Sequence, residues 1–148
     1  MIQLPKDFSE FLKLLNSKQA EYLIIGGWAV GFYGYPRATG DLDIWVSRKE
    51  ENALKLVEAL KEFGFDLPNL STDLFTSENQ ITRLGLPPMR IEILTTISGV
   101  SFDECFSNRK TVSMPEVTAH IIDLEDLKKN KLAAKRYKDL DDFENLNQ

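Results

Sequence analysis

The feature that most constrains the fold is an apolar segment that stops at two glycines and is soon followed by a second apolar segment with two aspartates. Residues 22–25 read Tyr-Leu-Ile-Ile, Gly26 and Gly27 follow, and residues 41–46 read Asp-Leu-Asp-Ile-Trp-Val. Side chains alternate between the two faces of a strand, so Asp41 and Asp43 are expected on one face. Two adjacent carboxylates repel each other, and a divalent cation between them relieves that repulsion. The spacing therefore predicts a metal site.

The two glycines predict a phosphate site next to these aspartates. A short helix is expected at residues 28–32, directly after Gly26 and Gly27. Backbone N–H groups at the start of a helix bind phosphate, and glycine allows the phosphate to come close. A phosphate site beside two metal-binding carboxylates indicates phosphoryl-group chemistry.

A third carboxylate extends the same pattern. Residues 90–94 read Arg-Ile-Glu-Ile-Leu, with polar and apolar side chains alternating. If this strand lies beside the one with Asp41 and Asp43, Glu92 adds a third oxygen ligand. Such a set suits Mg²⁺ or Mn²⁺, which prefer oxygen ligands and keep waters for substrate phosphates. The alternative is that these acids are simply the solvent-facing side of alternating strands.

Size and composition predict one domain over residues 1–148. The chain is 43% hydrophobic and 28% charged, with a net charge of −5, so any basic binding site must be local. Its one cysteine, Cys105, excludes an intrachain disulfide. The N-terminus lacks a signal-peptide pattern, and no apolar run approaches the roughly 20 residues that span a membrane. We expect a cytoplasmic protein without membrane contact.

Local patterns predict alternating strands and helices, hence an α/β fold. Capping patterns place helix starts at Ser47 (with Glu50) and Asp123, and Gly64 has the residue type of a helix C-terminus. Residues 81–84 and 90–94 are expected to form a hairpin. Strands are predicted at residues 22–25, 41–46, 81–84, 90–94 and 117–122, a helical turn at 102–106, and helices at 7–16, 28–32, 47–63, 124–135 and 139–146.

Residues 26–29 (Gly-Gly-Trp-Ala) and 37–44 (Arg-Ala-Thr-Gly-Asp-Leu-Asp-Ile) together resemble the signature of the nucleotidyltransferase superfamily with the polymerase-beta-like fold. Thr39 and the C-terminal stretch 126–142 resemble small bacterial members related to abortive-infection and type IV toxin–antitoxin nucleotidyltransferases. The resemblance implies a small mixed β-sheet flanked by helices, with a C-terminal helical segment at about residues 123–148.

The resemblance also implies roles for individual residues. Catalysis and metal binding would fall to Asp41, Asp43 and Glu92. Nucleotide binding would fall to Gly26, Gly27 and Lys131, with Thr39 beside them. Arg37, in the loop before the aspartates, would either contact a phosphate or pair with Asp41. Glu92 stands where the family often has an aspartate, and the chain lacks the separate helical domain of many relatives, so a homodimer or a partner protein is expected.

A basic segment near the C-terminus offers a second binding feature. Lys128, Lys131 and Lys135 are spaced to share one face of a helix. This face would neutralise a triphosphate or steer an RNA backbone, or it is a solvated face whose cations complement the helix dipole. Asp139 and Asp142, spaced by three residues, are read as caps of the last helix.

The expected reaction is metal-dependent transfer of a nucleoside monophosphate from a nucleoside triphosphate to a hydroxyl of an RNA (a tRNA among them), protein or small-molecule acceptor. Two other readings stay open. One is a non-catalytic module that binds nucleotide or a partner. The other is a toxin–antitoxin component that acts on a partner protein or a tRNA.

Overall fold

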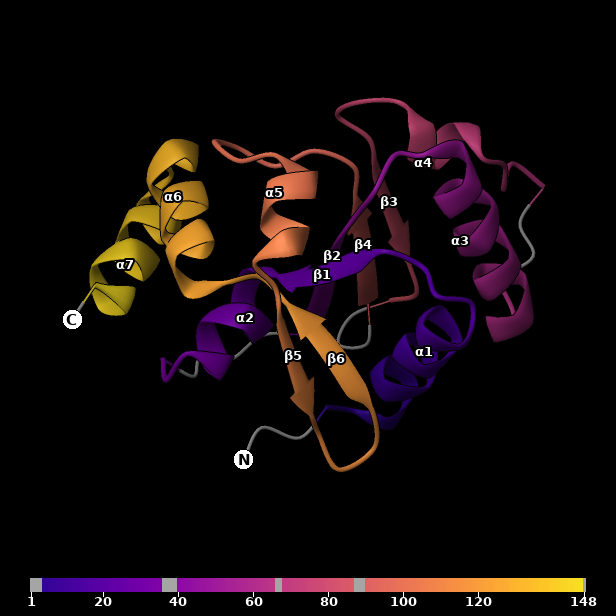
Figure 1. Ribbon diagram of the computed structural model, residues 1–148, viewed down its shortest axis with the longest axis horizontal. Coiled ribbons are helices and arrows are strands. Elements are labelled where there is room, and N and C mark those ends of the chain that lie inside the picture. Colours follow the sequence, from indigo (N-terminus) through magenta and orange to yellow (C-terminus); the bar gives the residue numbers. More distant parts are fainter. Residues whose placement is uncertain (1–3, 36–39, 66–67, 87–89, 148) are drawn as a thin grey trace.

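A six-stranded mixed β-sheet forms the centre of the structure (Figure 1), a computed structural model that describes residues 4–35, 40–65, 68–86 and 90–147. The strand order is β3-β4-β2-β1-β6-β5. β1 runs antiparallel to β2 and parallel to β6, while β4 runs parallel to β2 and antiparallel to β3. The strands are β1 (Tyr22–Ile25), β2 (Asp41–Val46), β3 (Ile81–Leu84), β4 (Arg90–Leu94), β5 (Lys110–Ser113) and β6 (Thr118–Ile121).

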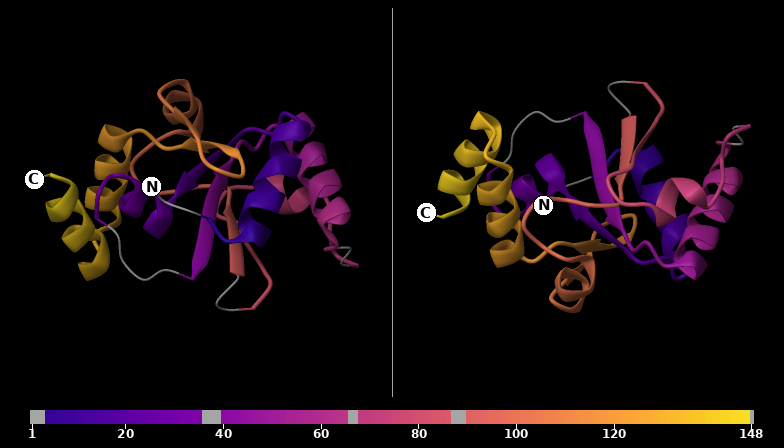
Figure 2. Two further views of the ribbon diagram at one scale, coloured as in Figure 1. Left: turned by 90° about the horizontal axis from the view of Figure 1, so that it is seen from below. Right: turned by 90° about the horizontal axis from the view of Figure 1, so that it is seen from above.

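Helices pack at both ends of the molecule. α1 and α3 lie against each other on one side, and α6 and α7 form a pair at the opposite end (Figures 1 and 2). The predicted α/β fold, a mixed sheet flanked by helices, is confirmed. The helices are α1 (Lys6–Ser17), α2 (Gly26–Phe32), α3 (Glu50–Phe63), α4 (Asp73–Thr76), α5 (Phe102–Ser107), α6 (Leu124–Ala134) and α7 (Tyr137–Leu146).

The hydrophobic core lies between the sheet and the α1–α3 pair. Phe11 of α1 is fully buried, and its ring centroid is 5.3 Å from that of Phe63 in α3. Leu42 and Ile44 are also fully buried and point to the face of β2 opposite Asp41 and Asp43. The apolar side of β2 is thus used for packing, which leaves the aspartate side available for a site.

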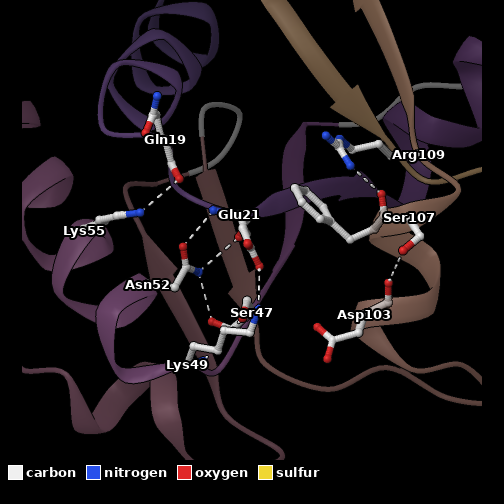
Figure 3. A network of polar contacts seen from close by, with 10 residues as sticks. Gln19, Glu21, Ser47, Lys49, Asn52, Lys55, Asp103, Ser107 and Arg109 are labelled. Atoms are coloured by element: carbon white, nitrogen blue, oxygen red, sulfur yellow. Dashed lines mark hydrogen bonds and ion pairs between the residues drawn. The ribbon is translucent and has the colours of Figure 1, made fainter.

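A buried asparagine fixes α3 relative to β1 and β2 (Figure 3). Asn52 Oδ1 accepts a hydrogen bond from the backbone N–H of Glu21 at 2.7 Å. Its Nδ2 donates to the backbone oxygens of Glu21 at 3.1 Å and Ser47 at 3.0 Å. These bonds join the residue before β1 to the residue after β2, so one side chain satisfies backbone groups that a sheet end would leave unpaired.

Helix ends were predicted with mixed success. Gly64 has φ +106° at the end of α3, and Asp123 Oδ2 accepts from Glu125 N at 3.1 Å at the start of α6, so both predictions are confirmed. The start at Ser47 is wrong, because α3 begins at Glu50 without a side-chain cap and Ser47 Oγ instead accepts from Lys49 N.

Two short elements, α4 and β5, were not predicted. Each has four residues and few apolar side chains, so the sequence carries little periodic signal. α7 begins at Tyr137 rather than at residue 139. No helix within the described ranges has the length and apolar character needed to cross a membrane. The organisation of residues 1–148 as one domain stays a prediction.

Candidate active site

Three carboxylates from two paired strands form the centre of the candidate site. In the parallel pairing of β2 with β4, Asp43 lies opposite Glu92, and Asp41 lies two residues before Asp43 on the same face. One oxygen from each of the three side chains can be chosen so that all lie within 4.8 Å of one another. The structure therefore brings together the three acids that the sequence predicted to be neighbours.

Gly26 lies directly beside this cluster. Ile25 pairs with Asp43 across β1 and β2, and α2 begins at the next residue. Gly26 has φ +68°, and a Cβ atom built at this position would overlap Asp43 Oδ2. Both the left-handed backbone and the close approach require glycine here.

Asp43 has an unusual electrostatic environment. Burial, followed by the negative charges of Glu92 and Asp41, raises its pKa to about 7. Its Oδ1 is buried and has no hydrogen-bond partner among the residues that the structure describes. A buried acceptor without a partner costs about 1–3 kcal/mol. A cation ligated by this oxygen would remove that cost, and the all-oxygen donor set suits Mg²⁺ or Mn²⁺.

Two arginines on the neighbouring strands contact the cluster. Arg90 Nη2 is 2.8 Å from Asp41 Oδ2 and 3.3 Å from Glu92 Oε1. Arg83 Nε of β3 is 3.2 Å from Glu92 Oε1. Neither arginine was among the predicted site residues, although the alternation along residues 90–94 places Arg90 on the same face as Glu92.

Lys131 of α6 lines the same cleft as the three carboxylates, and its surroundings differ from the prediction. Its side chain is only 6% exposed, and its Nζ lies 3.3 Å from Asp139 Oδ1 and 3.1 Å from Asp142 Oδ2. α6 ends at Ala134, and Lys135 has φ +61°. The expected row of three lysines on one solvated helix face is therefore wrong, because Lys131 is buried in an ion pair.

The two aspartates of this ion pair are not helix caps. Both belong to α7 and are buried, and α7 has no side-chain cap. Burial works to raise the pKa of Asp139, but the hydrogen bond from Arg136 and the charge of Lys131 outweigh it and hold that pKa below its usual range. The Asp139 carboxylate therefore stays charged and helps to hold Lys131 in place. We call Lys131, Arg136, Asp139 and Asp142 the α6–α7 ion network.

A cleft of about 560 Å³ separates the carboxylate cluster from the α6–α7 ion network. Its lining includes Gly26, Gly27 and the three carboxylates, residues of β3 and of the segment after β4, and residues of α6 and α7. The predicted residues Gly26, Gly27, Asp41, Asp43, Glu92 and Lys131 all line this cleft. Arg37 and Thr39, predicted to bind nucleotide, lie outside the described residues.

Further charged residues that were not predicted individually as site residues also line the cleft. These are Arg83, Arg136, Lys138 and Asp139. Arg136 Nε lies 2.6 Å from Asp139 Oδ2. Arg136 and Lys138 follow Lys131 in a basic stretch of sequence. The turn between α6 and α7 that brings them to the cleft could not be predicted, because Lys135 rather than a glycine adopts the positive φ there.

Comparison with known proteins agrees with this geometry. Among solved structures, the chain resembles a Thermotoga maritima protein proposed to be a nucleotidyltransferase, with a TM-score of 0.63 over 93% of this chain and 88% of that chain. The two sequences are 16% identical, so this likeness concerns the fold alone. No curated protein matches the chain significantly.

The sequence profile of the aminoglycoside-2''-adenylyltransferase family matches residues 7–124, which include both glycines and all three carboxylates of the cleft. The match spans about four-fifths of the 148 residues. The chain thus belongs to the aminoglycoside-2''-adenylyltransferase family and is a nucleotidyltransferase.

Proposed function

We propose that this chain transfers a nucleoside monophosphate from a nucleoside triphosphate to a hydroxyl group, and that Asp41, Asp43 and Glu92 hold the divalent metal ions that the reaction needs. The observation that carries the proposal is the meeting of three carboxylates from β2 and β4, with oxygens within 4.8 Å of one another, in a cleft that also contains Gly26 and Gly27. Structural ion pairs alone would not leave a buried Asp43 oxygen without a protein donor in the described part of the chain.

The donor set is consistent with one or two Mg²⁺ or Mn²⁺ ions. When bound, such ions neutralise the triphosphate and lower the pKa of an attacking hydroxyl. Glu92 reaches further than an aspartate would at this position. Its carboxylate is the candidate to orient the acceptor hydroxyl or to accept its proton, while Asp41 and Asp43 fix the phosphate side.

Lys131 is the candidate phosphate contact on the α6 side of the cleft. An ammonium group has three N–H donors, of which one is hydrogen-bonded to Asp139 Oδ1, while Asp142 Oδ2 forms an ion pair with the ammonium. A remaining N–H can reach a phosphate oxygen in the cleft. The α6–α7 ion network would then position a charge that stabilises the leaving pyrophosphate. Arg37 and Thr39 remain predicted nucleotide contacts.

The charges in the cleft bear on the acceptor. Three of the carboxylates among the described lining residues form the metal cluster, and Asp139 is already paired with Lys131 and Arg136. An aminoglycoside carries several ammonium groups, which need carboxylate partners. Lys138, which is exposed, instead offers positive charge to phosphates. We infer that an RNA acceptor fits this cleft better than an aminoglycoside.

The test is incubation of the purified protein with Mg²⁺ or Mn²⁺ and each labelled nucleoside triphosphate. Separate reactions contain total RNA including tRNA, total protein, or an aminoglycoside. Label is expected in RNA and is expected to disappear in Asp41→Asn/Asp43→Asn. Asp141→Asn, an exposed aspartate in α7, serves as the matched control.

Other outcomes would redirect the proposal. Metal-dependent nucleotide binding without transfer to any acceptor would favour a non-catalytic module. Label in protein or in the aminoglycoside would keep the reaction and overturn the choice of acceptor. A role as a toxin–antitoxin component is a separate hypothesis, which a partner protein that co-purifies and blocks transfer would support.

A further inference from the structure

Arg90 occupies a position between two of the three carboxylates. In the β2–β4 pairing it lies opposite Asp41, and Glu92 is two residues further along its own strand. A single nitrogen, Arg90 Nη2, contacts both Asp41 Oδ2 and Glu92 Oε1, at 2.8 Å and 3.3 Å. All three side chains are at least two-thirds buried. Arg90 therefore partly neutralises Asp41 and Glu92 but, in the part of the chain that the structure describes, makes no such contact with Asp43.

The hydrogen bonds of Arg90 leave it incompletely satisfied. Its Nε–H is buried and lacks a hydrogen-bond partner within the described ranges. Arginine–carboxylate pairs are frequently bidentate, with two parallel N–H···O bonds. Here the guanidinium is held mainly through one nitrogen, so a stronger cation for the carboxylates can displace it.

A divalent ion and Arg90 compete for the same two carboxylates, Asp41 and Glu92. Mg²⁺ binds carboxylate oxygens at about 2.1 Å, so an ion shared by Asp41 and Glu92 would lie within a few ångströms of Arg90 Nη2. Positive charges repel strongly at that separation in a partly buried site. The two cations cannot both keep their best contacts with these carboxylates.

We propose that Arg90 is a built-in counter-cation that holds Asp41 and Glu92 in place in the metal-free protein and that a divalent ion must displace from them. Arg90 is then a positioning residue that sets the metal affinity of the cluster. This inference rests on the proposed metal-dependent function. It predicts that the wild-type protein binds metal more weakly than three carboxylates without the arginine would.

The test is a titration of Mn²⁺ into the intact, nucleotide-free protein at pH 8, followed by electron paramagnetic resonance of the unbound ion. Arg90→Gln is expected to bind Mn²⁺ about tenfold more tightly than the wild type. Arg90→Lys, which keeps the charge, is expected to stay within about threefold of the wild type. Arg83→Gln is the matched control, because Arg83 is 55% exposed and, among the described residues, pairs with Glu92 but with no second carboxylate. Its effect should be smaller than that of Arg90→Gln.

A second measurement does not depend on the folding of a variant. In ¹⁵N-labelled wild-type protein, Mg²⁺ should shift the Nε–H signal of Arg90 and leave that of Arg48, which pairs with Glu78 away from the carboxylate cluster, unchanged. The inference would be overturned if Arg90→Gln bound Mn²⁺ no more tightly than the wild type, or if the Arg90 signal did not respond to Mg²⁺. In either case, metal binding by the wild type would leave the proposed function standing. Absence of Mn²⁺ binding in every variant would overturn both.

Discussion

The backbone of Gly26 lies against the side chain of Asp43 with no room for a Cβ atom between them. Gly26 directly follows β1 and begins α2, and Asp43 lies on β2 opposite Ile25. This contact fixes the distance between the predicted phosphate site and the predicted metal site. A change at Gly26 should therefore affect both sites at once.

Gly26→Ala is expected to destabilise the fold and impair the site. A non-glycine residue with a left-handed backbone costs about 1–2 kcal/mol, and forcing a methyl group against Asp43 adds about 1–3 kcal/mol. Urea unfolding measures the sum. Gly64→Ala is the matched control, because Gly64 also has positive φ but, chain neighbours and its own helix backbone aside, no atom of the described residues lies within 4 Å of its Cβ position. Equal losses for the two variants would show that Gly26 and Asp43 are not in contact in solution.

The raised pKa of Asp43 predicts a pH-dependent stability of the metal-free protein. Its pKa is about 7 in the folded chain against 3.8 for an ordinary aspartate. Between these values the folded state keeps a proton that the unfolded state has lost, so stability falls as pH rises from about 4 to about 7. Asp43→Asn removes this penalty.

At pH 8 without metal, Asp43→Asn is expected to raise the free energy of unfolding by about 1–2 kcal/mol. This value is smaller than the free energy obtained by converting the whole pKa difference at about 1.36 kcal/mol per pKa unit, because water still screens part of the site. Asp141→Asn should have no such effect. Mg²⁺ should stabilise the wild type more than Asp43→Asn. A variant less stable than the wild type at pH 8 and equally sensitive to pH would contradict the shifted pKa.

An RNA acceptor predicts a salt-dependent reaction. Lys138 is exposed and lines the cleft. Lys138→Gln should lower kcat/KM for RNA about three- to tenfold and reduce the slope of log affinity against log salt by about 1. Lys129→Gln, also exposed but on α6 outside the described cleft lining, should change neither. A salt-independent reaction would argue against contact with an RNA backbone.

Local alternation was enough to predict the shared face of Asp41 and Asp43, because the period of a strand is independent of its partners. The meeting of Asp43 with Glu92 needed the pairing of β2 with β4, which lies between residues almost fifty positions apart. From the sequence, the proximity of Asp43 and Glu92 could be predicted only on the condition that their two strands are neighbours. The family resemblance supported that condition, because it implies a third carboxylate on a later strand.

The ion pair of Lys131 could not be predicted from periodicity. Its partners lie eight and eleven residues further along the chain, on a different helix. They meet because the chain reverses at Lys135, which adopts φ +61° without being glycine. A lysine pattern on an isolated helix therefore suggested an exposed face, whereas tertiary packing placed Lys131 in the interior.

This buried position makes Lys131 a test of the α6–α7 ion network. Lys131→Met leaves Asp139 and Asp142, which are 1% and 2% exposed, without their shared ammonium partner. Removing one member of a buried ion pair typically costs about 3–5 kcal/mol. Lys129→Met, on the exposed side of the same helix, is expected to change stability by less than about 0.5 kcal/mol. Urea unfolding of the two variants measures the difference.

A triple variant separates stability from nucleotide binding. Lys131→Met/Asp139→Asn/Asp142→Asn removes the buried charges together, so most of the stability lost in Lys131→Met should return. Nucleotide transfer should stay low in the triple variant, because the proposed phosphate contact is still absent. Transfer that recovers together with stability would mean that Lys131 only supports the packing of α6 on α7. If Lys131→Met were as stable as Lys129→Met, the network itself would not exist in solution.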